Sequence, residues 1–151
     1  MPAEMIDRRE KEKILEQLGE RFGIEKLPYL LFKTGKEKTR GFSGHLSREE
    51  LKHLMDAVVV EIIGIYLLKE DKHEAFRLSL DGTHLLSSSL KKNILDISNE
   101  QAAHWLKGED IEVDKELFGF YAIKNNGDFL GCGKASQGRL VNFIPKERRI
   151  R

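Results

Sequence analysis

The sequence predicts an α+β protein whose helix-containing first part, residues 1–56, is followed by a β-rich second part, residues 57–151. The first observation is a set of three helix-start signals, in which Asp or Ser is followed three residues later by Glu or Gln. The second is a series of short apolar runs separated by turn residues along the second part. The chain has 151 residues, 40% of them apolar, which suits one compact domain or two small ones that share a core.

The first predicted helix begins after Asp7, because Glu10 stands where a capping box requires an acidic residue. Apolar residues then recur at helical spacing and form one stripe (Ile14, Leu15, Leu18 and Phe22). Gly23 follows the stripe directly and is expected to end the helix.

A hairpin and a second helix complete the first part. Two extended segments, 29–33 and 39–42, flank the polar run Thr34–Lys38, which we expect to be the hairpin loop. Ser47 with Glu50 forms the second capping box and opens a short helix. Residues 1–56 are therefore expected to form a small α/β segment.

The second part begins with two predicted strands and a third helix. Val58–Leu68 is rich in β-branched and aromatic residues, and Ala75–Leu80 alternates apolar with polar ones. Asp81–Gly82 predicts a turn after the second strand. Ser98 with Gln101 is the third capping box.

Three further strands are predicted towards the carboxyl end. Segments 118–123 and 129–130 flank Asn126–Gly127, a dipeptide typical of a type I′ hairpin turn. The last strand is expected over residues 140–144. Between these strands lies a glycine-rich segment, in which we expect the backbone to be open to a ligand (Gly131, Gly133 and Gly138).

The composition excludes several classes of protein. Cys132 is the only cysteine, so neither an intrachain disulfide nor a cysteine-rich zinc site can form. No two of the five histidines have the i, i+4 spacing of a metalloprotease pair. The longest apolar segment, 57–68, is too short to cross a bilayer, and residues 1–13 lack a signal-peptide pattern. We expect a soluble, cytoplasmic protein that makes no membrane contact.

The sequence contains no complete catalytic motif. The run from Gly131 to Lys134 resembles part of a phosphate-binding loop. It lacks the glycine five residues before Gly133 and the Ser or Thr after Lys134 that such a loop requires. Cys132 has no histidine close to it in the sequence, which favours a structural thiol. We expect no enzyme activity, no metal and no cofactor, and an activity that uses Cys132 as nucleophile is the alternative.

The net charge of +1 hides two segments of opposite charge. Residues 96–116 carry two basic and seven acidic residues, whereas residues 134–151 carry six basic residues and one acidic residue. Arginine and lysine beside glycine and proline suit contacts to nucleic-acid phosphates. The candidates for such contacts are Lys134, Arg139, Lys146, Arg148 and Arg149. Asn142, in the last strand, is expected either to bond a neighbouring turn or to contact RNA.

Two motifs resemble a known family. The run Leu130-Gly131-x-Gly133-Lys134, followed by Gly138-x-Leu140-x-Asn142-x-x-Pro145-Lys146-x-x-Arg149, is similar to the closing signature of the PUA-like RNA-binding domain. The similar version is the one at the C-terminus of RsmF/Sun-type 5-methylcytosine RNA methyltransferases. Upstream, Ile97-Ser98-x-Glu100-x-Ala102-x-x-Trp105-Leu106-x-Gly108-Glu109 resembles the helix corner of that family, with Lys107 in place of its arginine.

The resemblance implies a PUA-like mixed β pseudobarrel over residues 57–151, preceded by a small α/β segment over residues 1–56. It implies binding of structured RNA, ribosomal or transfer RNA, in RNA modification or ribosome biogenesis. Lys107 and Arg77 would extend the basic surface. The catalytic domain of those methyltransferases has no counterpart in this sequence, so the resemblance carries over RNA binding and not the enzyme activity.

The alternative function is that of a protein–protein adaptor. The acidic segment 96–116 would then contact a basic partner in ribosome assembly, or the chain would be a docking arm for a separate RNA-modifying enzyme.

Overall fold

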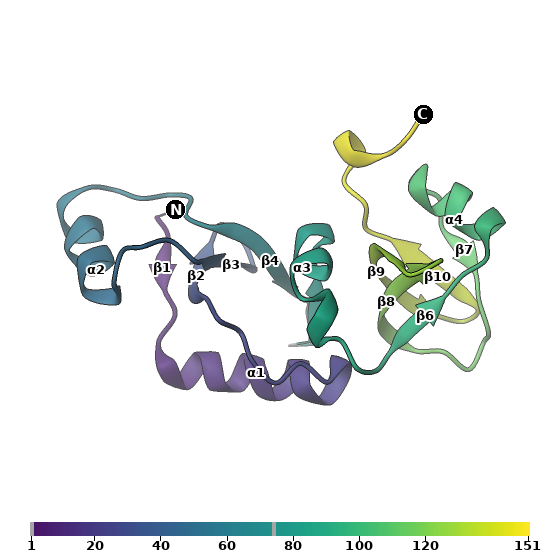
Figure 1. Cartoon of the computed structure of the whole chain (residues 1–151), viewed down its shortest axis with the longest axis horizontal. Coiled ribbons are helices and arrows are strands. Elements are labelled where there is room, and N and C mark those ends of the chain that lie inside the picture. The colour runs from purple at the N-terminus through teal and green to yellow at the C-terminus, as the bar shows by residue number, and fades with distance from the viewer. Residues whose placement is uncertain (1, 74) are drawn as a thin grey trace.

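The computed structural model describes residues 2–73 and 75–151, and the strands that it places there form two sheets of five strands each (Figure 1). The first sheet is antiparallel and follows sequence order: β1 (Glu4–Met5), β2 (Leu30–Thr34), β3 (Lys38–Phe42), β4 (Ile65–Glu70) and β5 (Phe76–Leu78). The second sheet has the order β6-β8-β9-β10-β7, and only β6 runs parallel to its neighbour within it. Its strands are β6 (Ile94–Asp96), β7 (Ile111–Glu112), β8 (Gly119–Asn125), β9 (Asp128–Ser136) and β10 (Arg139–Asn142).

Four α-helices and two 3₁₀ turns connect these strands in the described residues: α1 (Arg8–Phe22), α2 (Arg48–Ala57), α3 (Leu80–Leu85), η1 (Ser87–Ser89), α4 (Asn99–Leu106) and η2 (Lys146–Arg148). The second sheet curls into a half-barrel, at the right of Figure 1. The predicted fold class, α+β with a PUA-like mixed β pseudobarrel, is confirmed.

Local capping explains the ends of α1. The side chain of Asp7 accepts a hydrogen bond from the backbone N–H of Glu10 at 2.8 Å. Gly23 ends the helix in the left-handed conformation, with φ of 73°, which a side chain would disfavour. The stripe buries Ile14, Leu18 and Phe22 against the core, as the spacing predicts. The helices that begin after Ser47 and Ser98 have the predicted capping boxes.

The two halves of the chain share a hydrophobic core. Leu67, Leu68 and Leu78 of the first sheet pack in the same cluster as Phe120 and Cys132 of the second. A second cluster fills the inside of the curled sheet around fully buried side chains (Trp105, Ile123, Ala135 and Leu140). The position of the first sheet relative to the second is therefore fixed by apolar burial.

Three local predictions are wrong. Residues 58–64 form no strand, because they pair with no neighbouring strand and β4 begins only at Ile65. Asp81–Gly82 is not a turn, since Ser79 caps a helix there by accepting from the N–H of Gly82 at 2.8 Å. The glycine-rich segment is not an open loop, because β9 runs through Gly131 and Gly133.

The division of the chain at residue 57 stays a prediction. Strand pairing places β4 and β5, which follow that boundary, in the first sheet. No helix among the described residues is long and apolar enough to span a membrane.

Candidate nucleic-acid interface

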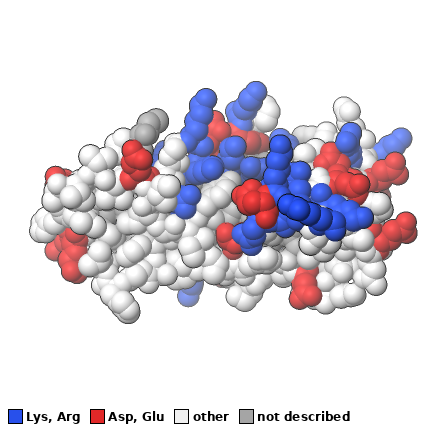
Figure 2. Space-filling view, turned by 90° about the horizontal axis from the view of Figure 1, so that it is seen from above, with Lys and Arg blue, Asp and Glu red and all other residues white. Residues whose placement is uncertain are grey.

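A groove lined by basic side chains lies between the two sheets. Its first concavity, of about 280 Å³, is lined by Lys38, Lys69 and Arg77 from the first sheet and by Arg148 from η2. A second concavity shares Lys69 and Arg77 with the first and adds Lys72 and Lys134. These two adjoining concavities are called the basic groove below. Figure 2, seen from the side on which η2 lies, shows Lys and Arg gathered over the middle of the molecule with acidic residues among them.

Aromatic rings hold some of these cations in place. The guanidinium of Arg77 lies 3.9 Å from the ring centroid of Phe143, and the Lys134 ammonium lies 5.3 Å from that of Phe120. The two rings are themselves neighbours, with centroids 6.4 Å apart. Cation–π contacts orient a side chain without neutralising its charge, so the ring of Phe143 leaves Arg77 available to a polyanion.

Carboxylates neutralise part of the groove. Six basic residues line it together with four acidic ones, Glu37, Glu70, Asp71 and Asp81. Arg148 Nη1 lies 3.2 Å from Asp81 Oδ1, and Lys134 Nζ lies 3.3 Å from Asp71 Oδ2. Half-exposed ion pairs of the Arg148 kind are worth about 0–1 kcal/mol, so a phosphate can replace the carboxylate.

Asp71 is more firmly held than Asp81. Burial alone would raise the pKa of its carboxyl group. Backbone hydrogen bonds from Ala75 and His73, together with the Lys134 ammonium, outweigh burial and lower that pKa. The Asp71 carboxylate therefore stays charged at neutral pH and anchors Lys134 at the groove.

Lys38, Lys69 and Arg77 carry most of the available charge. Among the residues that the structure describes, no carboxylate lies within ion-pair distance of any of the three. Lys69 and Arg77 sit opposite each other in the β4–β5 register, which brings their side chains to the same face of the sheet.

The predicted site residues divide into three groups. Arg77, Lys134 and Arg148 line the basic groove. Lys107, Arg149 and Asn142 lie at the end of α4, where Ile150 N–H donates to Leu106 and draws the carboxyl-terminal segment over the helix end. Arg139 belongs to this second group, because its Nε lies 2.9 Å from Oδ2 of Asp110, whose Oδ1 accepts from the backbone N–H of Asn142. Lys146 is exposed at the start of η2, directly after the groove residue Pro145.

Asn142 fastens β10 to the end of α4. Its amide group donates to the carbonyl oxygens of Trp105 at 2.7 Å and Glu109 at 2.9 Å, and its Oδ1 accepts from Ile144 N–H at 2.8 Å. Both amide hydrogens are therefore used within the protein. Of the two roles expected for Asn142, the structure shows the bond to a neighbouring turn.

Gly133 and Cys132 are packing residues. A Cβ atom at Gly133 would lie 2.7 Å from Cη2 of Trp105, so only glycine lets this strand pass over the indole ring. The indole N–H donates to the carbonyl of Leu130 at 2.8 Å. Burial raises the pKa of the Cys132 thiol to about 12, so this thiol is protonated at neutral pH. No metal-binding group of His, Cys, Asp or Glu occurs among the described residues.

The sequence alone did not identify the first-sheet side of the groove. Lys38 stands out in the sequence as part of a basic run near residues 33–40, but nothing local connects Lys69 or Lys72 with the carboxyl-terminal cations. These residues meet because β3, β4 and β5 pack against the curled sheet through the shared core.

The second half of the chain is similar to known proteins. The family model described as the methyltransferase RsmF PUA domain matches residues 92–150. The ribosomal RNA small subunit methyltransferase F of Vibrio vulnificus, from strains YJ016 and CMCP6, is 27% identical over 85 residues. That match covers 56% of this chain and 18% of each relative, so the chain spans less than a fifth of their length.

The matched segment contains all five strands of the curled sheet together with α4 and η2. It is a PUA domain match and includes no catalytic domain. Residues 92–150 are therefore similar to the PUA domain of RsmF-type methyltransferases.

Proposed function

We propose that this protein binds structured RNA through the basic groove and acts in RNA modification or ribosome biogenesis in the cytoplasm. The RNA is ribosomal or transfer RNA. Support comes from the RsmF-type PUA domain and from the ribosomal RNA methyltransferases that resemble it. In this proposal the chain is a binding module that has no catalytic activity and needs no cofactor.

One observation carries the proposal: cations from distant parts of the sequence meet in one groove. Lys38, Lys69 and Arg77 come from the first sheet, and Lys134 and Arg148 come from the matched PUA segment. A phosphate backbone repeats its charge along a strand, so a row of cations across two sheets fits it better than a single cluster does. Lys107, Lys146, Arg149 and Arg139 are proposed to flank this row.

The experiment is a salt titration of RNA affinity by fluorescence anisotropy. If four or five phosphates are neutralised, the slope of log K against log salt is about −3 to −4. The double variant Lys134→Gln plus Arg148→Gln should bind more weakly, and the magnitude of its slope should be smaller by about 2. Arg8→Gln plus Lys13→Gln is the matched control, because both residues are exposed on α1 outside the groove. Equal losses for the two double variants would contradict the proposal.

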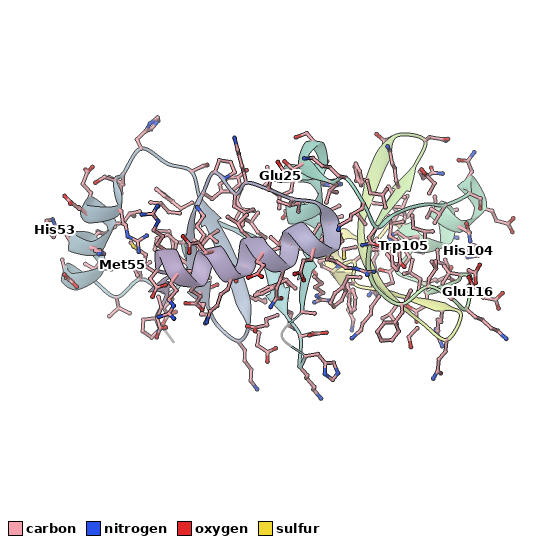
Figure 3. The ribbon with its side chains drawn as sticks, turned by 90° about the horizontal axis from the view of Figure 1, so that it is seen from below. Glu25, His53, Met55, His104, Trp105 and Glu116 are labelled. Atoms are coloured by element: carbon pink, nitrogen blue, oxygen red, sulfur yellow. The ribbon has the colours of Figure 1, made fainter. Side chains whose placement is uncertain are left out.

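A second candidate function, that of a protein adaptor, is favoured by the apolar surface around α2. Ten large apolar side chains are exposed among the described residues, and six of them fall within residues 46–65: Leu46, Leu54, Val58, Val59, Ile62 and Ile65. Helix α2 buries Leu51 alone, at the end of the molecule farthest from the curled sheet. In Figure 3, His53 and Met55 mark α2 at one end of the molecule, and Trp105 and His104 mark α4 at the other end.

An exposed apolar surface of this kind is typical of protein contacts. The partner would be a ribosome-assembly protein or a separate RNA-modifying enzyme. If the chain acted as an adaptor alone, RNA binding would be weak, and the substitutions in the basic groove would leave it unchanged.

A further inference from the structure

A third concavity adjoins the basic groove and has a different character. It has a volume of about 690 Å³ and shares Lys134 with the groove. Three aromatic residues, Phe76, Phe118 and Phe120, contribute to its wall, together with Arg21 and Gln17 of α1. It is called the Phe118 pocket below.

Phe118 is the reason for considering a ligand here. Its side chain is 71% exposed, although burial of a phenylalanine is strongly favourable. The backbone that follows the ring is held by Arg21, which donates to the carbonyl of Phe118 at 3.0 Å and to that of Phe120 at 2.6 Å. The Arg21 guanidinium also lies 4.6 Å from the ring centroid of Tyr121. The protein thus presents an aromatic ring on a fixed backbone.

The charges in the Phe118 pocket cancel. Arg21 and Lys134 line it together with the acidic residues Glu20 and Asp71. Lys134 is paired with Asp71, and Arg21 is occupied by two carbonyl oxygens. A phosphate would gain little in such surroundings, whereas an uncharged planar group would gain aromatic contact. The basic groove and the Phe118 pocket therefore suit different parts of one nucleotide chain.

We propose that the Phe118 pocket takes an unpaired RNA base by stacking it on Phe118. This inference rests on the proposed function, because the phosphates next to that base would lie in the basic groove. Lys134 lines both concavities and marks the point where the chain would pass from one to the other. Stacking on an aromatic side chain tolerates any base, so the pocket would select unpaired nucleotides without selecting their sequence.

The test compares two RNAs: a blunt-ended hairpin, and the same hairpin with a short unpaired 3′ extension. Phe118→Ala should weaken binding of the extended RNA about tenfold and leave the blunt hairpin unchanged. Phe118→Trp should keep the affinity for the extended RNA, because the indole also stacks. Leu85→Ala is the control, since Leu85 is a 43% exposed apolar residue that lies outside the pocket.

A second readout reports the stack directly. With 2-aminopurine in the extension, the wild-type protein should quench its fluorescence, and Phe118→Ala should not. Unchanged affinity of Phe118→Ala for the extended RNA, or an equal loss on both RNAs, would overturn the inference. If the substitutions in the basic groove still weakened both RNAs, the proposed function would survive that result. Failure of the wild-type protein to bind either RNA would overturn the proposed function itself.

Discussion

Neutralising Asp81 should strengthen RNA binding, although it removes an ion pair from the protein. In the free protein, the Asp81 carboxylate takes up the Arg148 guanidinium, with Nη1 at 3.2 Å from Oδ1 and 3.4 Å from Oδ2. The two side chains are 48% and 44% exposed, so the pair is worth about 0–1 kcal/mol. Asp81→Asn keeps the size of the side chain and frees Arg148 for a phosphate.

The size of the gain has two parts. Release of Arg148 recovers the energy of the pair, about 0–1 kcal/mol. Loss of a negative charge about 6 Å from a phosphate removes a repulsion of roughly 0.7 kcal/mol in water, which salt screening reduces further. Together they give about 0.5–1 kcal/mol, or about two- to fivefold tighter binding.

Fluorescence anisotropy with an RNA hairpin at physiological salt measures this gain. Asp128→Asn is the control, because it removes the same charge from an exposed position in the β8–β9 hairpin outside the groove. Unchanged or weaker binding by Asp81→Asn would refute the reasoning. An equal gain from Asp128→Asn would show that only total charge matters.

Two further predictions concern the core. Folding raises the pKa of the Cys132 thiol from 9.0 to about 12. The protonated thiol therefore adds to the free energy of unfolding below pH 9, and this addition is lost as the pH rises towards 12. The free energy of unfolding should fall by about 1 kcal/mol more between pH 8 and pH 10 in the wild type than in Cys132→Ala, measured by urea unfolding; parallel pH curves would contradict this. Gly133→Ala places a Cβ atom 2.7 Å from Trp105 and 2.9 Å from Leu140, and should destabilise the protein by about 1–3 kcal/mol in the same assay. Unchanged stability would mean that the indole ring moves aside.

Local signals in the sequence predicted the helices that begin after Asp7, Ser47 and Ser98, because a cap and its partner lie within one helical turn. The same rule missed α3, since Ser79 caps it without an acidic residue at Gly82, and Asp81–Gly82 has the composition of a turn. A capping bond is visible in the sequence only when both partners have typical side chains.

The candidate site was less predictable than the fold. The cations from Lys134 to Arg149 stand out because they are close in the sequence, yet Arg139 and Arg149 are directed to Asp110 and to the Ile144 carbonyl. Lys69 and Lys72 became site residues only through the packing of one sheet against the other. Such long-range packing depends on the whole core and leaves no signal in a short sequence window.

The central claim is that cations from both sheets form one RNA-binding surface. The most direct test is the RNA affinity and salt dependence of the double variant Lys69→Gln plus Arg77→Gln, because both residues lie outside the matched PUA segment. The account predicts that binding weakens by at least about tenfold and that the salt dependence becomes less steep, with the magnitude of the slope smaller by about 2. Unchanged affinity with an unchanged slope would contradict it, because the RNA would then contact the curled sheet alone.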